Sequence, residues 1–244
     1  TIVLPNGSQK RIDEKAKTGH YQQWETDFKL LEELGITYLR YGPPYYQTHL
    51  GPGKYDWDFT DLTFRKLKEL HIVPLVDLCH FVVPDWLGNF QNPDFPELFA
   101  AYAKAFARRF PYLQYYTPIN EPLTTARFSG LYGLWYPHKT DERGFIKMLF
   151  NQVKATVLAM REIRKINPEA KLVQTEDLGK THSTALLNYQ ASFENKRRWL
   201  TYDLLCGKVR PGHFFWNYFI SCGIREQDLG WLVENACAPD IMGF

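Results

Sequence analysis

Five short segments rich in β-branched, aromatic and aliphatic residues recur along this chain, with amphipathic segments between them. The predicted strands cover residues 36–41, 72–78, 114–119, 171–176 and 239–244. The segments between them place apolar residues three and four positions apart, which is typical of helices that bury one face. Because strands that alternate with helices form a mostly parallel sheet, this alternation predicts an α/β fold.

The helical spacing is clearest in four segments, and two further helices are expected nearer the end of the chain. The four segments cover residues 24–34, 62–70, 99–110 and 145–160, and the further two cover 184–205 and 225–235. No linker or low-complexity segment interrupts the series. We therefore interpret residues 1–244 as a single domain of the kind that carries a catalytic site.

Two architectures fit a parallel sheet of this kind. A doubly wound sheet usually has a glycine-rich phosphate-binding turn after its first strand, and the sequence contains no such turn. Polar residues instead follow one strand after another, at Arg40, His80, Asn120, Glu121 and Glu176. This distribution is typical of a (β/α)8 TIM barrel, whose active site lies at the carboxyl ends of its strands. Since only five of the eight strands are visible and the chain does not begin with methionine, we expect a barrel that is incomplete at both ends.

The charge and the cysteine content of the sequence limit the kinds of partner and the cellular compartment that we expect. The 29 basic and 27 acidic residues give a formal net charge of +2 without a long run of one sign, so a nucleic-acid partner is not expected. No apolar run reaches the length of a membrane span. The four cysteines show no C-x-x-C spacing, which argues against a zinc or redox motif. So few cysteines favour a reducing compartment, and we expect a cytoplasmic protein. The oligomeric state stays open.

The stretch YYTPINEP, residues 115–122, ends the third predicted strand with a polar turn. Glu121 stands where barrel enzymes place catalytic groups. A carboxyl group in a water-poor site with aromatic walls can stay protonated near neutral pH and donate a proton to a leaving oxygen. Asn120 can bind a substrate hydroxyl, and Pro122 ends the strand and holds the turn. The alternative is that Asn-Glu-Pro is an ordinary turn.

Longer stretches around this motif resemble the family 1 glycoside hydrolases, the β-glucosidase family. YYTPINEPLTTARFSGLYGLWYP resembles the strand 4 segment of that family, which ends in Thr-x-Asn-Glu-Pro. CHFVVPDWL (79–87) resembles the end of its strand 3, YLRYGPPYY (38–46) its strand 2 motif, and PDIMGF (239–244) its strand 6. The resemblance implies a TIM barrel that acts on small carbohydrates or glycosides, without a metal or an organic cofactor.

Matched position by position, the resemblance implies a role for each polar residue. Glu121 would be the general acid/base of a retaining β-glycosidase, and Asn120 would bind the 2-hydroxyl of the sugar. His80 would bind the neighbouring hydroxyl, and Arg40 would support the charge of the nucleophile. The alternatives are structural, with His80 as a hydrogen-bonding residue and Arg40 in a salt bridge at the end of the barrel.

Tryptophans are the candidate platform for a sugar ring, because the faces of pyranoses are apolar enough to stack on aromatic rings. Trp135 or Trp86 would serve, although tryptophans are also common in protein cores.

The sequence departs from the family pattern in two places. Phe81 replaces the family's tryptophan, and the nucleophile motif Thr-Glu-Asn-Gly does not occur. A retaining glycosidase, a non-catalytic sugar-binding or scaffold barrel, and an inverting hydrolase that pairs Glu121 with Glu176 therefore remain as interpretations. Neighbouring strands place both carboxyl groups on the same side of a bound sugar. We therefore expect Glu176 to be a substrate-binding or structural acid rather than the missing nucleophile.

Overall fold

A five-stranded parallel sheet forms the centre of the molecule, seen in a computed structural model that describes residues 2–3, 6–7 and 9–244. Its strand order is β3-β6-β7-β8-β9, and each neighbouring pair is parallel. The strands are Tyr38–Tyr41 (β3), Val73–Asp77 (β6), Tyr115–Thr117 (β7), Lys171–Thr175 (β8) and Ile241–Gly243 (β9). All five predicted strands are therefore present, and the predicted parallel α/β sheet is confirmed.

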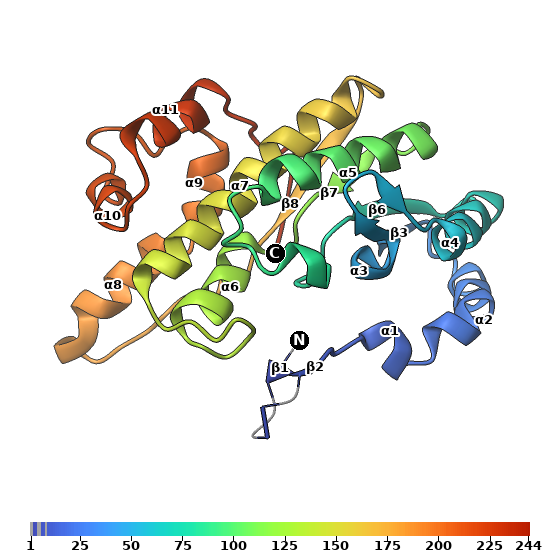
Figure 1. The fold of residues 1–244 in the computed structure, drawn as a ribbon, viewed down its shortest axis with the longest axis horizontal. Helices are drawn as coiled ribbons and strands as arrows, with labels where there is room; N and C mark the ends of the chain where they lie inside the picture. Colours follow the sequence, from blue (N-terminus) through green and yellow to red (C-terminus); the bar gives the residue numbers. More distant parts are fainter. Residues whose placement is uncertain (1, 4–5, 8) are drawn as a thin grey trace.

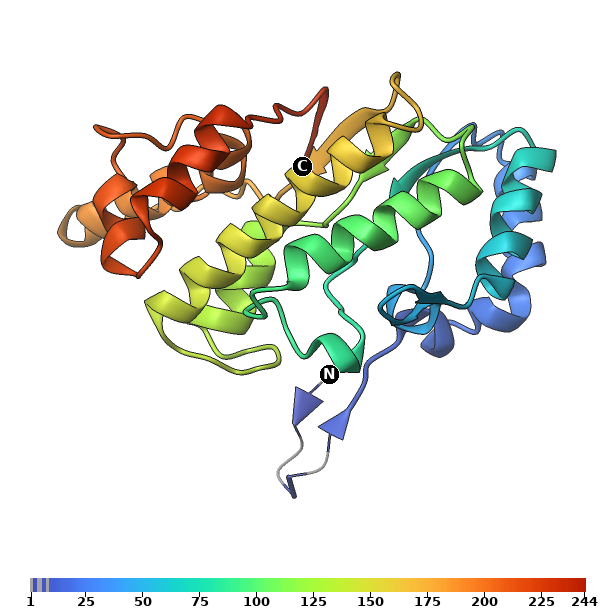
Figure 2. The same ribbon diagram turned by 45° about the horizontal axis from the view of Figure 1, so that its top comes forward.

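Helices connect the strands, and the two longest, α5 and α7, cross the same side of the sheet in Figures 1 and 2. The helices are α1 (Glu14–Lys17), α2 (His20–Glu33), α3 (Tyr45–Thr48), α4 (Asp58–Glu69), α5 (Phe95–Arg109), α6 (Pro122–Ala126), α7 (Glu142–Arg164), α8 (Asn188–Arg197), α9 (Leu200–Leu205), α10 (Trp216–Ser221) and α11 (Glu226–Glu234). Shorter turns are η1 (Asp85–Leu87), η2 (Arg127–Leu131) and η3 (Ala185–Leu187), and two hairpins pair β1 (Ile2–Val3) with β2 (Gln9–Lys10) and β4 (His49–Gly51) with β5 (Lys54–Tyr55).

Along β3 and β6, the two strands at one edge of the sheet, residues on one face are more exposed than residues on the other face. In β3, Tyr41 is buried whereas Tyr38 is 59% exposed, and in β6, Val76 is buried whereas Val73 is 37% exposed. Successive side chains of a strand point to opposite faces. One face therefore packs against the helices, and the other is more open in this part of the sheet.

The core between the sheet and its helices is rich in aromatic rings. The ring of Phe106 in α5 lies 5.3 Å from that of Phe64 in α4 and 6.4 Å from that of Tyr116 in β7, both edge to face. Phe145 and Leu149 of α7 are also fully buried. Such edge-to-face contacts are favourable beyond the burial of area. They hold β6 and β7 in place, and so position the turns that follow these strands.

The sequence pattern predicts the long helices well and the short ones poorly. The helix expected over residues 184–205 is divided into η3, α8 and α9. Leu200 and Leu204 of α9 are buried, whereas most of α8 is not, so the two segments pack differently. The pattern does not predict α6, α10 or the hairpins, because periodicity shows only over windows of about 11–18 residues.

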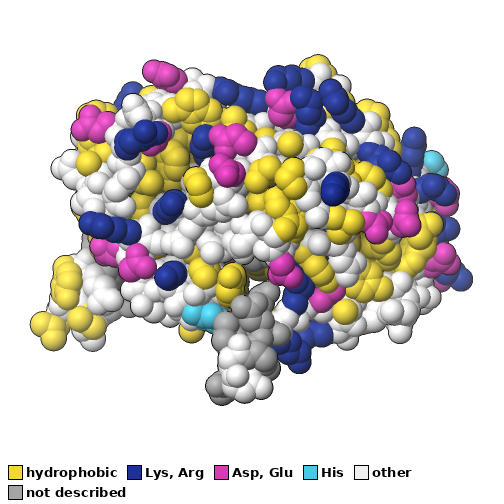
Figure 3. All heavy atoms as spheres, in the orientation of Figure 1, with side chains coloured by type: hydrophobic (Ala, Val, Ile, Leu, Met, Phe, Trp, Pro, Cys, Tyr) yellow, Lys and Arg dark blue, Asp and Glu magenta, His cyan; other side chains and the backbone are white. Residues whose placement is uncertain are grey.

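Basic and acidic side chains are interspersed over the face shown in Figure 3. Exposed hydrophobic residues gather at the tip formed by η3 and the start of α8, at the lower left of that view: Leu186, Leu187 and Tyr189. Within the described part of the chain, no helix has both the length and the apolar character that a membrane span requires.

Candidate functional site

The turn after β7 carries Asn120 and Glu121 and is tied to the neighbouring strand end. The backbone N–H of Asn120 donates to the carbonyl of Cys79, at 3.0 Å, and the N–H of Leu78 donates to the carbonyl of Thr117, at 3.1 Å. Pro122 then begins α6, at a position where its missing N–H costs nothing. The segments after β6 and β7 are therefore joined at the predicted site.

Glu121 adopts a left-handed backbone conformation, with φ +42° and ψ +65°. Phe81, after β6, is also left-handed, with φ +62°. A residue with a Cβ loses about 1 kcal/mol or more in this region of conformational space. Strain of this kind clusters at functional sites, where the surrounding structure holds it in place.

One carboxylate that the sequence analysis missed connects the predicted residues. Asp77, the last residue of β6, forms a salt bridge through Oδ2 with Arg40 Nη2, at 2.8 Å, and accepts at the same oxygen from His80 Nδ1, at 2.6 Å. Arg40 Nη2 also donates to Asn120 Oδ1, at 2.6 Å. The structure thus brings Arg40, His80 and Asn120 into one network, and Asp77 is its centre.

This network determines which atoms His80 offers to a ligand. A carboxylate only accepts hydrogen bonds, so His80 donates from Nδ1 to Asp77. When the ring is neutral, its Nε2 is then an acceptor. A sugar hydroxyl is a donor that such an acceptor can bind.

A close approach of two backbones keeps Arg40 within reach of Asp77. Gly42 follows β3, and a Cβ placed on it would lie 1.6 Å from the carbonyl oxygen of Asp77. Any side chain at this position would push the end of β3 away from β6. The absence of a side chain at Gly42 is therefore a condition for the network.

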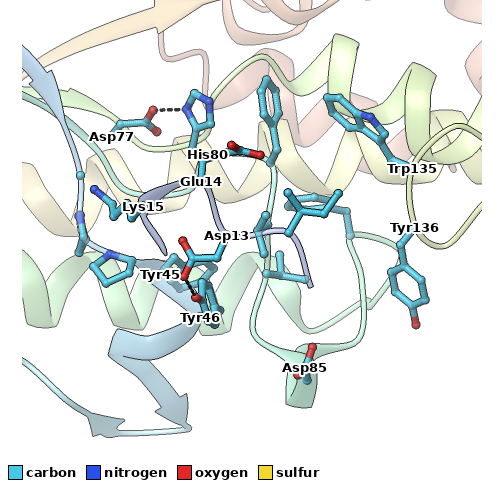
Figure 4. A pocket seen from close by; sticks show the side chains of 18 of the residues that line it. Asp13, Glu14, Lys15, Tyr45, Tyr46, Asp77, His80, Asp85, Trp135 and Tyr136 are labelled. Atoms are coloured by element: carbon cyan, nitrogen blue, oxygen red, sulfur yellow. Dashed lines mark hydrogen bonds and ion pairs between the residues drawn. The ribbon is translucent and has the colours of Figure 1, made fainter. Parts of the chain in front are cut away.

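A cavity of about 640 Å³ opens beside the network (Figure 4). Arg40, Asp77, His80 and Trp135 line it, and Figure 4 shows Asp77 and His80 toward one side and Trp135 toward the other. Its volume lies in the range of small-molecule sites. Aromatic rings supply much of the remaining wall: Tyr21, Tyr41, Tyr45, Tyr46, Phe81, Phe90 and Tyr136. Asn120, Glu121 and Glu176 are not among the lining residues.

The two candidate tryptophans differ in their positions. The ring of Trp135 borders the cavity and packs against Phe81 at 4.9 Å and against Phe128 at 4.8 Å. Trp86 instead donates from Nε1 to the carbonyl of His49, at 2.8 Å, and does not line the cavity. Of the two candidate tryptophans, only Trp135 therefore borders the cavity.

The segment before α2 forms another wall of the cavity, which the sequence analysis did not anticipate. The ammonium group of Lys15 lies 4.1 Å from the centre of the Tyr41 ring. Burial lowers the pKa of Lys15 to about 8, against the attraction of Asp77 and Asp13. Asp13 caps α1 and accepts from the hydroxyl of Tyr21, at 3.1 Å. These residues belong to no recognisable motif, so only the folded chain reveals their position.

Glu176 lies behind the turn of Glu121 and is only 2% exposed. Its Oε1 accepts from the backbone N–H of Leu123, at 2.6 Å, and from the hydroxyl of Thr201, at 2.5 Å, and its Oε2 accepts from Thr124 Oγ1 at 3.4 Å. Burial raises the pKa of Glu176 to about 7, the hydrogen bond from Thr201 opposes this, and the nearby Glu121 adds to it. The predicted substrate-binding acid is thus bonded to the protein itself, at the start of α6.

The described residues contain no group of three or more His, Cys, Asp or Glu side chains placed to hold a metal ion. All four cysteines are free, and Cys79, Cys222 and Cys237 are buried. Burial raises the pKa of the Cys79 thiol, and the charge of Asp77 raises it further. A protonated thiol is a poor nucleophile, so Cys79 behaves as a small hydrophobic residue beside the site.

Known proteins share this sequence pattern. The family model described as Glycosyl hydrolase family 1 matches residues 5–198. Beta-glucosidase A of Thermotoga maritima is 25% identical over 161 residues, which are 63% of this chain and 36% of that protein. The 6-phospho-beta-galactosidase of Streptococcus mutans is 31% identical over 110 residues, which are 41% of this chain and 23% of that protein. The chain therefore matches between about a quarter and little more than a third of the length of these curated relatives.

Solved structures share the fold. The family 1 β-glucosidase from Thermotoga maritima in complex with isofagomine lactam superposes with a TM-score of 0.81 at 19% identity, over 91% of this chain and 53% of that one. The AHE enzyme from Alicyclobacillus herbarius gives a TM-score of 0.79 at 23% identity, over 92% of this chain and 54% of that one. The likeness confirms the predicted incomplete (β/α)8 barrel. With the family model matched over most of its residues, the chain belongs to glycosyl hydrolase family 1.

Proposed function

We propose that this chain supplies the acid/base half of a retaining β-glycosidase active site, with Glu121 as the general acid/base. The observation that carries the proposal is the strained, left-handed conformation of Glu121 at the carboxyl end of β7. Barrel enzymes place catalytic groups at such strand ends, and strained residues there are held for a purpose. Membership of family 1 supports a glycoside as the substrate.

The mechanism has two steps. In the first, Glu121 donates its proton to the glycosidic oxygen while a second carboxylate forms a bond to the anomeric carbon and the aglycone leaves. In the second, Glu121 takes a proton from water, whose oxygen replaces the carboxylate at the anomeric carbon. Glu121 is thus regenerated in its acid form, and we assign the second carboxylate to no residue of this chain.

We propose that Asn120 and His80 hold sugar hydroxyls. Asn120 is held at Oδ1 by Arg40 and by Thr175 Oγ1, at 2.6 Å and 3.1 Å, and its Nδ2 has no hydrogen-bond partner among the described side chains and backbone. That amide can donate to a hydroxyl, whereas Nε2 of His80 can accept from one. A ligand that engages both gains affinity because it leaves neither group unmatched.

The geometry of Glu176 argues against an inverting pair with Glu121. An inverting base activates a water molecule that lies between the two carboxyl groups. Glu176 is buried, and both of its oxygens accept hydrogen bonds from the protein. It is therefore poorly placed to take a proton from such a water molecule.

The substitution Glu121→Gln tests the proposal. We expect it to lower hydrolysis of β-glycosides with poor leaving groups by on the order of 100-fold or more, because the leaving oxygen loses its proton donor. Substrates with good leaving groups should lose less in the first step. Assays should use this chain and, where the gene encodes more, the complete gene product.

Glu169→Gln is the matched control. It makes the same chemical change at a residue that is exposed, in the turn before β8. Unchanged turnover in a folded Glu121→Gln protein would remove Glu121 from the mechanism. Sugar binding without hydrolysis, in the complete gene product with Glu121 intact, would instead indicate a non-catalytic sugar-binding barrel.

A further inference from the structure

The buried carboxyl group of Glu176 is joined to the segment that directly follows Glu121. Pro122 has no N–H, so the N–H of Leu123 is the first backbone donor that α6 offers. That N–H donates to Glu176 Oε1 at 2.6 Å, and the side chain of Thr124 adds a longer contact to Oε2. Glu176 therefore holds the two residues that anchor the strained turn from its carboxyl side.

A second element fixes Glu176 in place. Thr201, on α9, donates to the same Oε1 at 2.5 Å, and it is fully buried. The carboxyl group thus bridges α6 and α9 across the end of β8. Because both neighbours lie in the core, the side chain of Glu176 has no alternative position in solvent.

We propose that Glu176 is a positioning residue, whose carboxylate holds the turn that carries Glu121 and whose protonation loosens that hold. The part of this inference that concerns catalysis rests on the proposed function of Glu121. The link between Glu176 and the turn itself does not, because it depends only on the contacts to α6 and α9.

The chemistry of the carboxyl group gives the direction of the effect. An ionised carboxylate accepts hydrogen bonds at both oxygens, and these bonds are shorter and stronger than neutral ones. Protonation turns one oxygen into a hydroxyl and removes the charge of the group, so the hydrogen bonds that it accepts become weaker. The Leu123 N–H then faces a weaker acceptor, and the start of α6 is held less firmly.

The surroundings place this change in the neutral range. The titratable and charged groups around this end of the sheet are Glu121, the Arg127–Asp177 pair at 3.4 Å, and two residues of α9. The latter are Tyr202 and Asp203, and Asp203 pairs with Lys208 at 3.9 Å and with His213 at 3.5 Å. Burial is the main reason that the pKa of Glu176 rises to about 7, and the charge of Glu121 adds to the effect. Burial, with a contribution from Glu176, raises the pKa of Tyr202 to about 12, so its hydroxyl stays protonated throughout.

The amide of Leu123 reports on the hydrogen bond directly and can be followed by NMR in isotope-labelled protein from about pH 5 to about pH 9. We expect its proton resonance to move downfield as Glu176 ionises, with a midpoint near 7. Glu176→Gln should abolish the titration. Thr201→Val should raise the midpoint, because it removes the hydrogen bond that most favours the ionised form.

Glu169→Gln is again the matched control, since it neutralises an exposed carboxylate in the turn before β8 and should leave the midpoint of Leu123 unchanged. A Leu123 amide that does not titrate in the wild-type protein would overturn the inference, and so would a titration that persists in Glu176→Gln. If Glu176→Gln fails to fold, the wild-type titration and Thr201→Val still decide the matter.

The measurement separates this inference from the proposed function. A Leu123 amide that titrates with Glu176, in a complete gene product that hydrolyses no glycoside, would support the positioning role and contradict the role of Glu121. Hydrolysis that depends on Glu121, in a protein whose Leu123 amide does not titrate, would support the role of Glu121 and contradict the positioning role of Glu176.

Discussion

The turn after β7 and the cavity beside β3 and β6 hold their polar groups in different ways. Asn120 in the turn and Glu176 behind it are almost completely buried, and protein groups occupy most of their hydrogen-bonding atoms. At the cavity, the side chain of His80 is 56% exposed, and Asp77 holds it from one side only. The turn is built to keep a group fixed, whereas the cavity wall leaves an atom free for a ligand.

This difference leads to a general expectation. A substitution in the turn should cost folding stability together with function, because buried polar partners are left unmatched. A substitution at the cavity wall should cost ligand affinity and little stability. Each of the following predictions tests that division.

The largest effect should come from Gly42→Ala. Gly42 lies on the cavity side, yet we expect this substitution to cost folding stability, so it is an exception to the general expectation. The added Cβ would meet the Asp77 carbonyl oxygen at 1.6 Å, so the ends of β3 and β6 must separate. We expect a loss of about 3 kcal/mol or more in the free energy of unfolding, measured by urea denaturation.

Gly230→Ala is the control for Gly42→Ala. Gly230 lies inside α11, and nothing approaches the position of its added Cβ. Alanine favours helix there, so the protein should gain up to about 1 kcal/mol. Equal stability changes in the two variants would mean that the close approach of β3 and β6 has no energetic weight.

The stability of the protein should depend on pH because of Glu176, which lies behind the turn. Its pKa in the folded protein, about 7, lies above the ordinary value of 4.5, so the folded state binds the proton more tightly. This stabilisation is fully present below about 4.5 and is lost as the pH rises through about 7, up to a limit of about 3 kcal/mol. The ionised group makes stronger local hydrogen bonds, yet it costs more to bury.

The comparison to make is between the wild type and Glu176→Gln, by urea denaturation on either side of this range. The stability of the wild type relative to Glu176→Gln should fall as the pH rises. A difference that is independent of pH would show that Glu176 titrates alike in the folded and unfolded chain.

The smallest effects should appear on sugar binding. His80→Ala and Asn120→Ala should each weaken the binding of a monosaccharide or a competitive inhibitor by about 1–3 kcal/mol, as measured by calorimetry. The turn residue, Asn120, should also lose folding stability when replaced, whereas the cavity residue, His80, should lose little. Equal losses of stability in the two variants would remove the distinction between turn and cavity wall.

Part of this site is readable from the sequence because strand ends in a barrel converge. Arg40 lies near the end of β3, His80 follows β6 and Asn120 follows β7, and the parallel order of these strands brings them together. The sequence analysis does not identify Asp77, because this residue lies inside the apolar run IVPLVDL and no motif distinguishes it from other residues of the strand. Only the register of β3 on β6, with Arg40 opposite Leu75, shows that its carboxylate meets the guanidinium group.

The partners of Glu176 show a second limit of sequence analysis. Its place after β8 is predictable, but Thr201 lies 25 residues further along, on a helix that the periodicity merges with α8. Spacing in the sequence gives no sign that these two side chains meet. The cavity wall formed by Lys15 is hidden for a similar reason, since it depends on how the first helix folds back over Tyr41.

The backbone of Glu121 has a consequence for laboratory evolution of this protein. Glycine is at ease in the left-handed conformation, so Glu121→Gly removes a strain of about 1 kcal/mol. A library screened for heat resistance alone would tend to enrich that change, whereas a library screened for turnover would discard it. Selection for stability and selection for turnover therefore favour different residues at position 121. The codon for this residue should be sequenced in thermostable variants before their activity is compared.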